Sequence, residues 1–216
     1  MSTLLPTLLS LALVAAPDVR WVPVEGPTDV DVHSYNCDGG TLTMMGKDGS
    51  FHRIEDGGWV RLTGPPPLGT EHTARMFIAP DDTIWTTTGD RALLHRFDGE
   101  VWEGPITLPP GYVHDMVFAP DGTPYAVGIH GYVVREGPDG WLPVPDLPID
   151  KSVESNIYNA EFDRDGTLWL QNHDGLLLRV NAEGAVRLDP GDAGRYRVIL
   201  GSDRRPLLTG NQLRRL

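Results

Sequence analysis

Short runs of alternating apolar and polar residues fill the chain from residue 20 onwards, and turn residues separate each run from the next. The clearest stretch is Phe162–Val180, FDRDGTLWLQNHDGLLLRV, in which DRDG and NHDG interrupt the apolar runs. Alternation with a period of two is typical of half-buried strands, and Asp-Gly pairs are typical of tight turns. The pattern therefore predicts an all-β protein made of short antiparallel strands.

The same phrase recurs five times along the chain. Its register positions, each just after a turn, are Thr41, Thr83, Thr123, Thr167 and Arg205. The intervals between them are 42, 40, 44 and 38 residues. A repeat of about 40 residues with four strands is the sequence signature of a β-propeller blade. We therefore expect a β-propeller of four-stranded antiparallel blades.

The fifth unit ends after its third predicted strand, NQLRRL, so one strand of that unit is missing. Residues 20–27, RWVPVEGP, match the fourth-strand phrases GWVRLTGPP and GWLPVPDLP of other units. A strand from the N-terminal end that completes the last blade would close the ring and cover an exposed sheet edge. We expect one five-bladed domain over residues 17–216; a fragment of a larger propeller is the alternative.

Two further columns support this register. An Arg recurs late in the third strand and a Trp recurs in the fourth strand. Recurrence at equivalent positions favours packing between blades over ligand binding. In the second unit, Trp102 is offset by one residue from its turn, which would send its side chain to the opposite face unless a bulge absorbs the difference. The columns are Arg53, Arg96, Arg135, Arg179 and Arg215, and Trp21, Trp59, Trp102 and Trp141.

The phrase DGTLWL…GLLLRV resembles the repeats of bacterial two-component-regulator propellers and, more loosely, those of virginiamycin B lyase-like propellers. The resemblance covers residues 18–216 as a repeat pattern and implies the blade architecture. Those families include sensors, enzymes and binding modules, so the resemblance implies no single function. This chain departs from both families because it has five units where those rings have more.

Thirty acidic and eighteen basic residues give a net charge of −12. This charge repels nucleic-acid phosphates and anionic lipid, so we expect no nucleic-acid partner. The single Cys37 excludes an internal disulfide framework and a Cys-based zinc site, and its place in the repeat favours a small packing residue. We expect no cofactor and a monomer.

The first sixteen residues, MSTLLPTLLSLALVAA, carry no charged side chain, and their apolar run is too short to span a bilayer as a helix. The small residues Val14, Ala15 and Ala16 suit signal peptidase, although a positively charged segment is missing and Pro17 would follow the cut. We expect residues 1–16 to be a signal peptide of a secreted or periplasmic protein that does not insert into a membrane. The alternative is an arm packed on a cytoplasmic domain.

The alternating carboxylates Asp163 and Asp165 before Gly166 invite comparison with a calcium loop. The EF-hand pattern fails because Gln171 takes the ninth position, on a predicted strand. The phrase also belongs to the repeat, so we interpret it as a turn and expect no metal site.

The strongest candidate site comes from the position eight residues before each register residue, near the start of the innermost strand. Every residue in this column is polar, whereas the next column is mostly apolar. Alternation along a strand then directs the first set toward the mouth of the central channel and the second into the blades. We expect His114, beside Asp115, to lie at the same mouth. The polar column is His33, Arg75, Asp115, Asn159 and Arg197, and the next is Ser34, Met76, Met116, Ala160 and Val198.

Three functions fit this ring. The first is a non-catalytic binding module that takes a protein or glycan partner on the face of the loops that lead from one blade to the next, because variable loops on a repeated framework are where recognition is built. The second is an enzyme, a glycoside hydrolase or a lyase, with His114 and Asp115 as acid or base. The third is a structural propeller whose channel holds only water. The first is our expectation, without catalytic residues.

Overall fold

The computed structural model describes residues 31–38, 41–62, 75–87, 93–149, 155–172, 176–188, 197–200, 205–209 and 214–215. All regular structure in this part of the chain is β, apart from one 3-10 turn, η1 (Ile129–Gly131). No helix in the described ranges is long and apolar enough to cross a membrane.

The strands form five antiparallel meanders. The first contains β1 (Val32–Asp38), β2 (Thr41–Gly46), β3 (Phe51–Glu55) and β4 (Gly58–Leu62). The second contains β5 (Met76–Ile78), β6 (Ile84–Thr87), β7 (Leu93–Phe97) and β8 (Trp102–Thr107). The third contains β9 (Val113–Phe118), β10 (Pro124–Gly128), β11 (Val133–Gly137) and β12 (Gly140–Pro143).

The last two meanders follow the same plan. The fourth contains β13 (Asn159–Phe162), β14 (Leu168–Gln171), β15 (Leu177–Asn181) and β16 (Gly184–Leu188). The fifth contains the three described strands β17 (Arg197–Leu200), β18 (Pro206–Thr209) and β19 (Arg214–Arg215). The expected completion of this sheet by residues 20–27 lies outside the described residues, as does the expected signal peptide.

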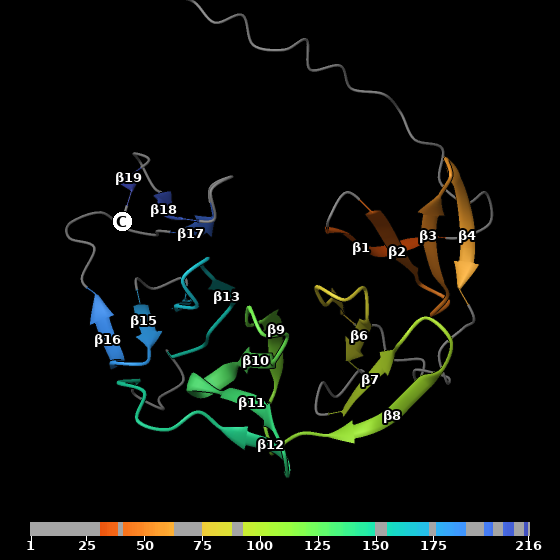
Figure 1. Cartoon of the computed structure of the whole chain (residues 1–216). Coiled ribbons are helices and arrows are strands. Elements are labelled where there is room, and N and C mark those ends of the chain that lie inside the picture. The colour runs from red at the N-terminus through yellow and green to blue at the C-terminus, as the bar shows by residue number, and fades with distance from the viewer. Residues whose placement is uncertain are drawn as a thin grey trace, which may run out of the picture.

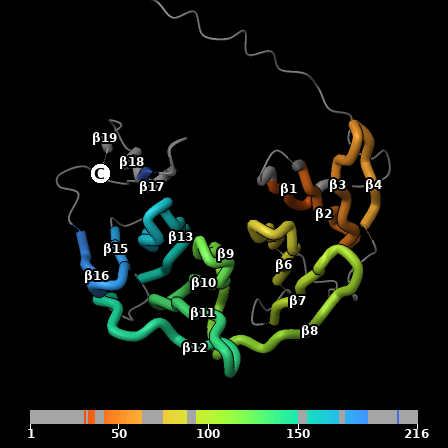
Figure 2. The backbone as a smooth tube through the Cα atoms, viewed as in Figure 1, coloured from red at the N-terminus to blue at the C-terminus, as the bar shows by residue number. Residues whose placement is uncertain are grey.

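The sheets follow one another around a common centre, and each four-stranded sheet has its first strand on the inner side and its fourth strand on the outside (Figure 1). The inner strands β1 and β5 contact each other, β9 contacts β13, and β13 contacts β17. In Figure 2, β9 and β13 lie side by side close to this centre. These three pairs of inner strands therefore lie next to each other near the centre.

The strand register confirms the Arg column. In every sheet the third-strand Arg lies opposite the equivalent second-strand residue, so the five repeats share one register between their second and third strands. The offset expected for Trp102 is wrong: it pairs with Phe97 just as Trp141 pairs with Glu136, because Trp102 follows Arg96 at the same distance in sequence as Trp141 follows Arg135.

The core lies between neighbouring sheets, where aromatic rings meet. Trp102 of the second sheet contacts Phe51 of the first, with ring centroids 5.2 Å apart. Trp85 of the second sheet contacts Trp141 of the third at 6.2 Å. These contacts confirm packing between the units for Trp102 and Trp141, since most of the side chains involved are buried. Trp21 lies outside the described residues.

The DRDG phrase forms a turn built around Asp163, which is only 6% exposed. One carboxylate oxygen accepts hydrogen bonds from the N–H groups of Asp165 and Thr167, at 3.0 and 2.9 Å. The other accepts a bond from Nε1 of Trp169 at 3.0 Å. The carboxylate is thus committed to the turn, in agreement with the interpretation of this phrase as part of the repeat.

The first strand of the fourth unit is shorter than its sequence pattern indicates, because residues 155–158 are not in the strand. Their backbone bonds go elsewhere: Ser155 accepts a hydrogen bond from the N–H of Gly131, and the N–H of Ile157 donates to Gly128. This segment therefore fastens the fourth sheet to η1 of the third.

Candidate ligand-binding face

Four of the five residues of the predicted ring occupy equivalent places at the start of the inner strands. Asp115, Asn159 and Arg197 each lie opposite the residue twelve positions later. Arg75 shares this place, since its carbonyl accepts a hydrogen bond from the N–H of Thr87. His33 differs because a register shift separates Val32 from Ser34.

Burial agrees with the expected alternation. Met76, Met116 and Ala160 are 7, 4 and 3% exposed, whereas Asp115 and Asn159 are half-buried. Arg75 and His33 are exposed. The side chains of Arg197 and Val198 lie outside the part that the structure describes. Ligand binding by the ring stays a prediction.

His114 occupies a bulge. Asp115 pairs with Val127 and Val113 pairs with Gly128, so His114 is the extra residue in β9. The irregularity in β1 likewise falls at His33. Bulges re-aim a side chain and are frequent beside functional sites. His33 and His114 therefore both lie where the regular pairing of the inner strand with its neighbour is interrupted.

The His114 ring contacts two tyrosine rings. Its centroid lies 5.1 Å from that of Tyr112 and 4.7 Å from that of Tyr158, which belongs to the next sheet. The side-chain amide of Asn156 donates to the Tyr158 hydroxyl at 3.2 Å, and its oxygen accepts a bond from the N–H of His130 at 3.0 Å. We call Tyr112, His114 and Tyr158 the aromatic ridge.

The sequence column did not point to either tyrosine. A signal was present, because Tyr158 immediately precedes Asn159 just as His114 immediately precedes Asp115. Tyr112 had no such signal, since it lies in a connection between units rather than in the repeat.

The carboxylate of Asp115 joins the third and fourth sheets. Its Oδ1 accepts a hydrogen bond from the N–H of Met116 at 3.0 Å, and its Oδ2 accepts one from the N–H of Ala160 at 3.1 Å. Burial raises the pKa of Asp115 to about 7; the two backbone bonds and Arg75 oppose this shift, and Glu161 adds to it. This carboxyl is thus poised to change charge near neutral pH.

Arg75 completes the cluster from the second sheet. Its guanidinium donates a hydrogen bond to the carbonyl oxygen of His114. The structure thus brings together Arg75, His114, Asp115 and Asn159, from three successive inner strands, and adds Glu161 to them. In the described ranges, no group of three His, Cys, Asp or Glu residues is placed to hold a metal ion.

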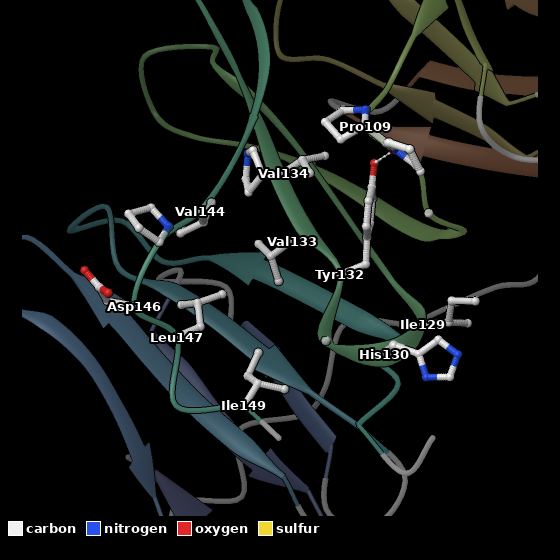
Figure 3. A pocket seen from close by; sticks show the side chains of 15 residues that line it. Pro109, Ile129, His130, Tyr132, Val133, Val134, Val144, Asp146, Leu147 and Ile149 are labelled. Atoms are coloured by element: carbon white, nitrogen blue, oxygen red, sulfur yellow. Dashed lines mark hydrogen bonds between the residues drawn. The ribbon is translucent and has the colours of Figure 1, made fainter. Parts of the chain in front are cut away.

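A pocket of about 480 Å³ opens on the same loop face, around η1 (Figure 3). Tyr132 forms one side and Val133 the floor, while Val144, Leu147 and Ile149 form the other side. The last three belong to the connection after β12, which was expected to carry recognition. Most of the pocket's lining residues are apolar, with His130 and Asp146 among the exceptions. The repeat pattern did not indicate this pocket, because the connections between the units are not repeated.

Known structures share this architecture, although no family model matches the sequence and no curated protein matches it. Virginiamycin B lyase from Staphylococcus aureus superimposes with a TM-score of 0.66 at 17% identity, over 87% of this chain and 67% of that one. YCF48, solved bound to a D1 peptide, superimposes with a TM-score of 0.67 at 16% identity, over 91% of this chain and 68% of that one.

The extracellular domain of the hybrid two-component system BT3049 from B. thetaiotaomicron gives a TM-score of 0.57 at 13% identity, over 85% of this chain. The chain has a β-propeller fold. This agrees with the resemblance seen in its repeats, and each four-stranded meander corresponds to one blade. The superposition with this chain covers only 28% of the BT3049 chain.

Proposed function

We propose that this propeller is a non-catalytic binding module that takes a polypeptide segment on the face formed by the aromatic ridge and the pocket around η1. The observation that carries the proposal is the apolar pocket, which opens beside exposed loops on a rigid β framework. Aliphatic walls suit a peptide side chain, whereas sugar sites depend on polar groups and stacked rings. The peptide-bound state of the similar propeller YCF48 supports the same choice over a glycan.

We infer further that the module is a monomeric five-bladed ring closed by residues 20–27. Five repeats and five described sheets support the blade count. We also infer export to the periplasm or the exterior after removal of residues 1–16. The extracellular location of the similar regulator domains supports this inference.

A peptide-display selection tests the binding function. Residues 17–216 are used to select peptides from a random library, and the affinity of each selected peptide is measured by fluorescence anisotropy. Tyr158→Ala should weaken binding about tenfold or more, because it removes a large face of the aromatic ridge. The control Asp139→Lys, in an exposed turn on the opposite face, should bind normally. If Tyr158→Ala leaves the peptide affinity unchanged and Asp139→Lys lowers it, the binding face lies at the other end of the ring.

Catalysis is the second candidate, and Asp115 is the observation that favours it. A carboxyl with a pKa of about 7 beside a histidine suits general acid or base chemistry. However, both of its oxygens already accept backbone hydrogen bonds, one of them from the next blade, which favours a structural duty. A catalytically inactive His-to-Ala variant of virginiamycin B lyase was solved with quinupristin. Incubation of this chain with quinupristin, followed by mass spectrometry, tests the alternative; conversion lost in His114→Ala would establish it.

A further inference from the structure

Building on the proposed function, we propose that the pocket around η1 is the anchoring site for a partner segment that carries an aliphatic side chain next to a lysine or arginine. The aliphatic side chain would fill the pocket, and the basic side chain would pair with Asp146 at its rim. We call this site the Tyr132 pocket and define it by Tyr132, Val133, Val144, Leu147 and Ile149.

The size and lining of the Tyr132 pocket indicate an apolar guest. Its volume of about 480 Å³ lies within the range of ligand sites in proteins. Val133 is 4% exposed and forms a closed floor, while Val144, Leu147 and Ile149 are half-buried and present apolar surface to the cavity (Figure 3). The apolar atoms of a guest would remove this apolar surface from water, which favours binding.

One wall is held in place before any partner arrives. The Tyr132 hydroxyl donates a hydrogen bond to the carbonyl of Pro109 at 2.8 Å. The ring lies against Gly111 so closely that a Cβ atom there would be 2.2 Å from Cε2 of Tyr132. No larger residue fits at this position without displacing the ring.

The opposite wall is held equally firmly. The N–H of Val144 donates to the carbonyl of Val133 at 2.9 Å. Ile149 packs on Gly131, where a Cβ atom would be 2.5 Å from its Cγ2. Because both walls are already ordered, a guest would not have to pay for ordering them.

The rim supplies the charge preference. Asp146 is the one formally charged residue among those that line the pocket, and it is exposed. In the described part of the chain no lysine or arginine forms an ion pair with it. The protein carries a net charge of −12, which attracts a basic partner and repels an acidic one.

The backbone at the rim is also unusual. Asp146 and His130 adopt positive φ angles of 56° and 54°, a region that glycine occupies more easily. In Figure 3 the two side chains lie at opposite ends of the pocket. Aspartate and histidine tolerate this region better than most residues, so each end of the rim carries a polar side chain where glycine would carry none.

The surroundings favour a polypeptide over a small molecule. From His130, hydrogen bonds lead through Asn156 to Tyr158 and the aromatic ridge. A segment anchored in the Tyr132 pocket can therefore continue across the ridge toward the channel mouth. A small apolar ligand would use the pocket alone.

The proposal is tested by titrating the full chain, carrying labelled methyl groups, with short capped peptides and following the methyl signals by NMR. The probe is acetyl-Ala-Leu-Lys-Ala-amide, and the matched probes replace Lys by Glu or Leu by Ser. We expect the Leu-Lys peptide to shift the methyl signals of Val133, Val144, Leu147 and Ile149 with a Kd on the order of millimolar, as befits so small a ligand. The Leu-Glu peptide should bind several-fold more weakly, and the Ser-Lys peptide should leave these methyls unshifted.

Asp146→Asn is the decisive variant because asparagine tolerates the same positive φ and keeps the shape of the side chain. It should weaken the Leu-Lys peptide by about two- to fivefold, the range for an exposed ion pair. Asp139→Asn, in an exposed turn of the opposite face, should leave the affinity unchanged. Equal affinities of the Leu-Lys and Leu-Glu peptides, or unshifted pocket methyls at about ten times the expected Kd, would overturn the proposal.

The two proposals can fail separately. If library peptides depend on Tyr158 but neither shift the pocket methyls nor respond to Asp146→Asn, the binding function stands and the Tyr132 pocket is not the anchor. If library peptides show no dependence on the loop face and the short peptides also leave the pocket methyls unshifted, both proposals fall.

Discussion

Asp115 on the inner strand of the third blade accepts a hydrogen bond from the backbone N–H of Ala160 on the inner strand of the fourth, at 3.1 Å. The bond ties two blades together at the point where the polar ring begins. Burial is the main cause that raises the pKa of this carboxyl to about 7, so the ionised form is less favourable at this position than in water. The stability of the blade interface should therefore depend on pH.

The first prediction concerns that dependence. In the unfolded chain the Asp115 carboxyl titrates near 4, whereas in the folded protein it keeps its proton up to about pH 7. The folded state thus binds more protons between these values, so this group lowers the free energy of unfolding as pH rises from 4 to 7. As pH rises through this range, the free energy of unfolding of the wild-type protein should fall by roughly 1–3 kcal/mol more than that of Asp115→Asn. Urea unfolding of both proteins at pH 5 and pH 8 measures it. Parallel pH profiles for the two proteins would contradict the shift.

The second prediction concerns the DRDG turn. Asp163→Ala deletes a buried carboxylate that accepts three hydrogen bonds, and it leaves Nε1 of Trp169 without this acceptor. We expect a loss of about 2–4 kcal/mol in the free energy of unfolding, since each buried donor left unsatisfied costs about 1–3 kcal/mol. The control is Asp121→Ala, an exposed turn residue that accepts a bond from the N–H of Thr123, which should cost about 1 kcal/mol or less. Equal losses in urea unfolding would show that burial of Asp163 adds nothing.

The sequence predicted the features that recur in every unit, and it did not predict those that occur in one unit only. The five units share one register, and this register predicted both the Arg column opposite the second strand and the alternation around Asp115. A position inferred in one unit could be compared with the equivalent position in the others. The Tyr132 pocket lies in connections that differ between units, where no column exists to compare. The contact of Tyr158 with His114 joins two blades, and Tyr158 stands beside the polar column rather than in it.

The third prediction concerns the wall of the Tyr132 pocket. Burial raises the pKa of Tyr132 to about 12, so this hydroxyl should keep its proton and its bond to Pro109 at pH values that ionise an ordinary tyrosine. Tyr132→Phe should cost about 1 kcal/mol at neutral pH, because one hydrogen bond is lost and the packing is kept. Ultraviolet difference titration of the two proteins locates the Tyr132 step, and a step near pH 10 would refute its burial.

The fourth prediction concerns the packing that holds one blade to the next. Trp102 stacks on Phe97 of its own blade with centroids 5.0 Å apart and also contacts Phe51 of the first blade at 5.2 Å. Phe51 is fully buried, so its ring has no solvent to replace this contact. A double-mutant cycle of Phe51→Leu and Trp102→Leu should give a coupling energy of about 0.5–1.5 kcal/mol, the range for aromatic pairs.

The matched cycle pairs Phe51→Leu with Trp141→Leu, because Trp141 occupies the same column but contacts Trp85 at a different interface. Distant sites add within about 0.5 kcal/mol, so this coupling should be near zero. A similar coupling in both cycles would mean that the substitutions act through the whole ring rather than through one interface. A coupling confined to the Phe51 and Trp102 pair supports a propeller stabilised blade by blade, with each aromatic column residue acting on its neighbour. In such a structure the variable loops can change their residues for binding without disturbing the packing beneath them.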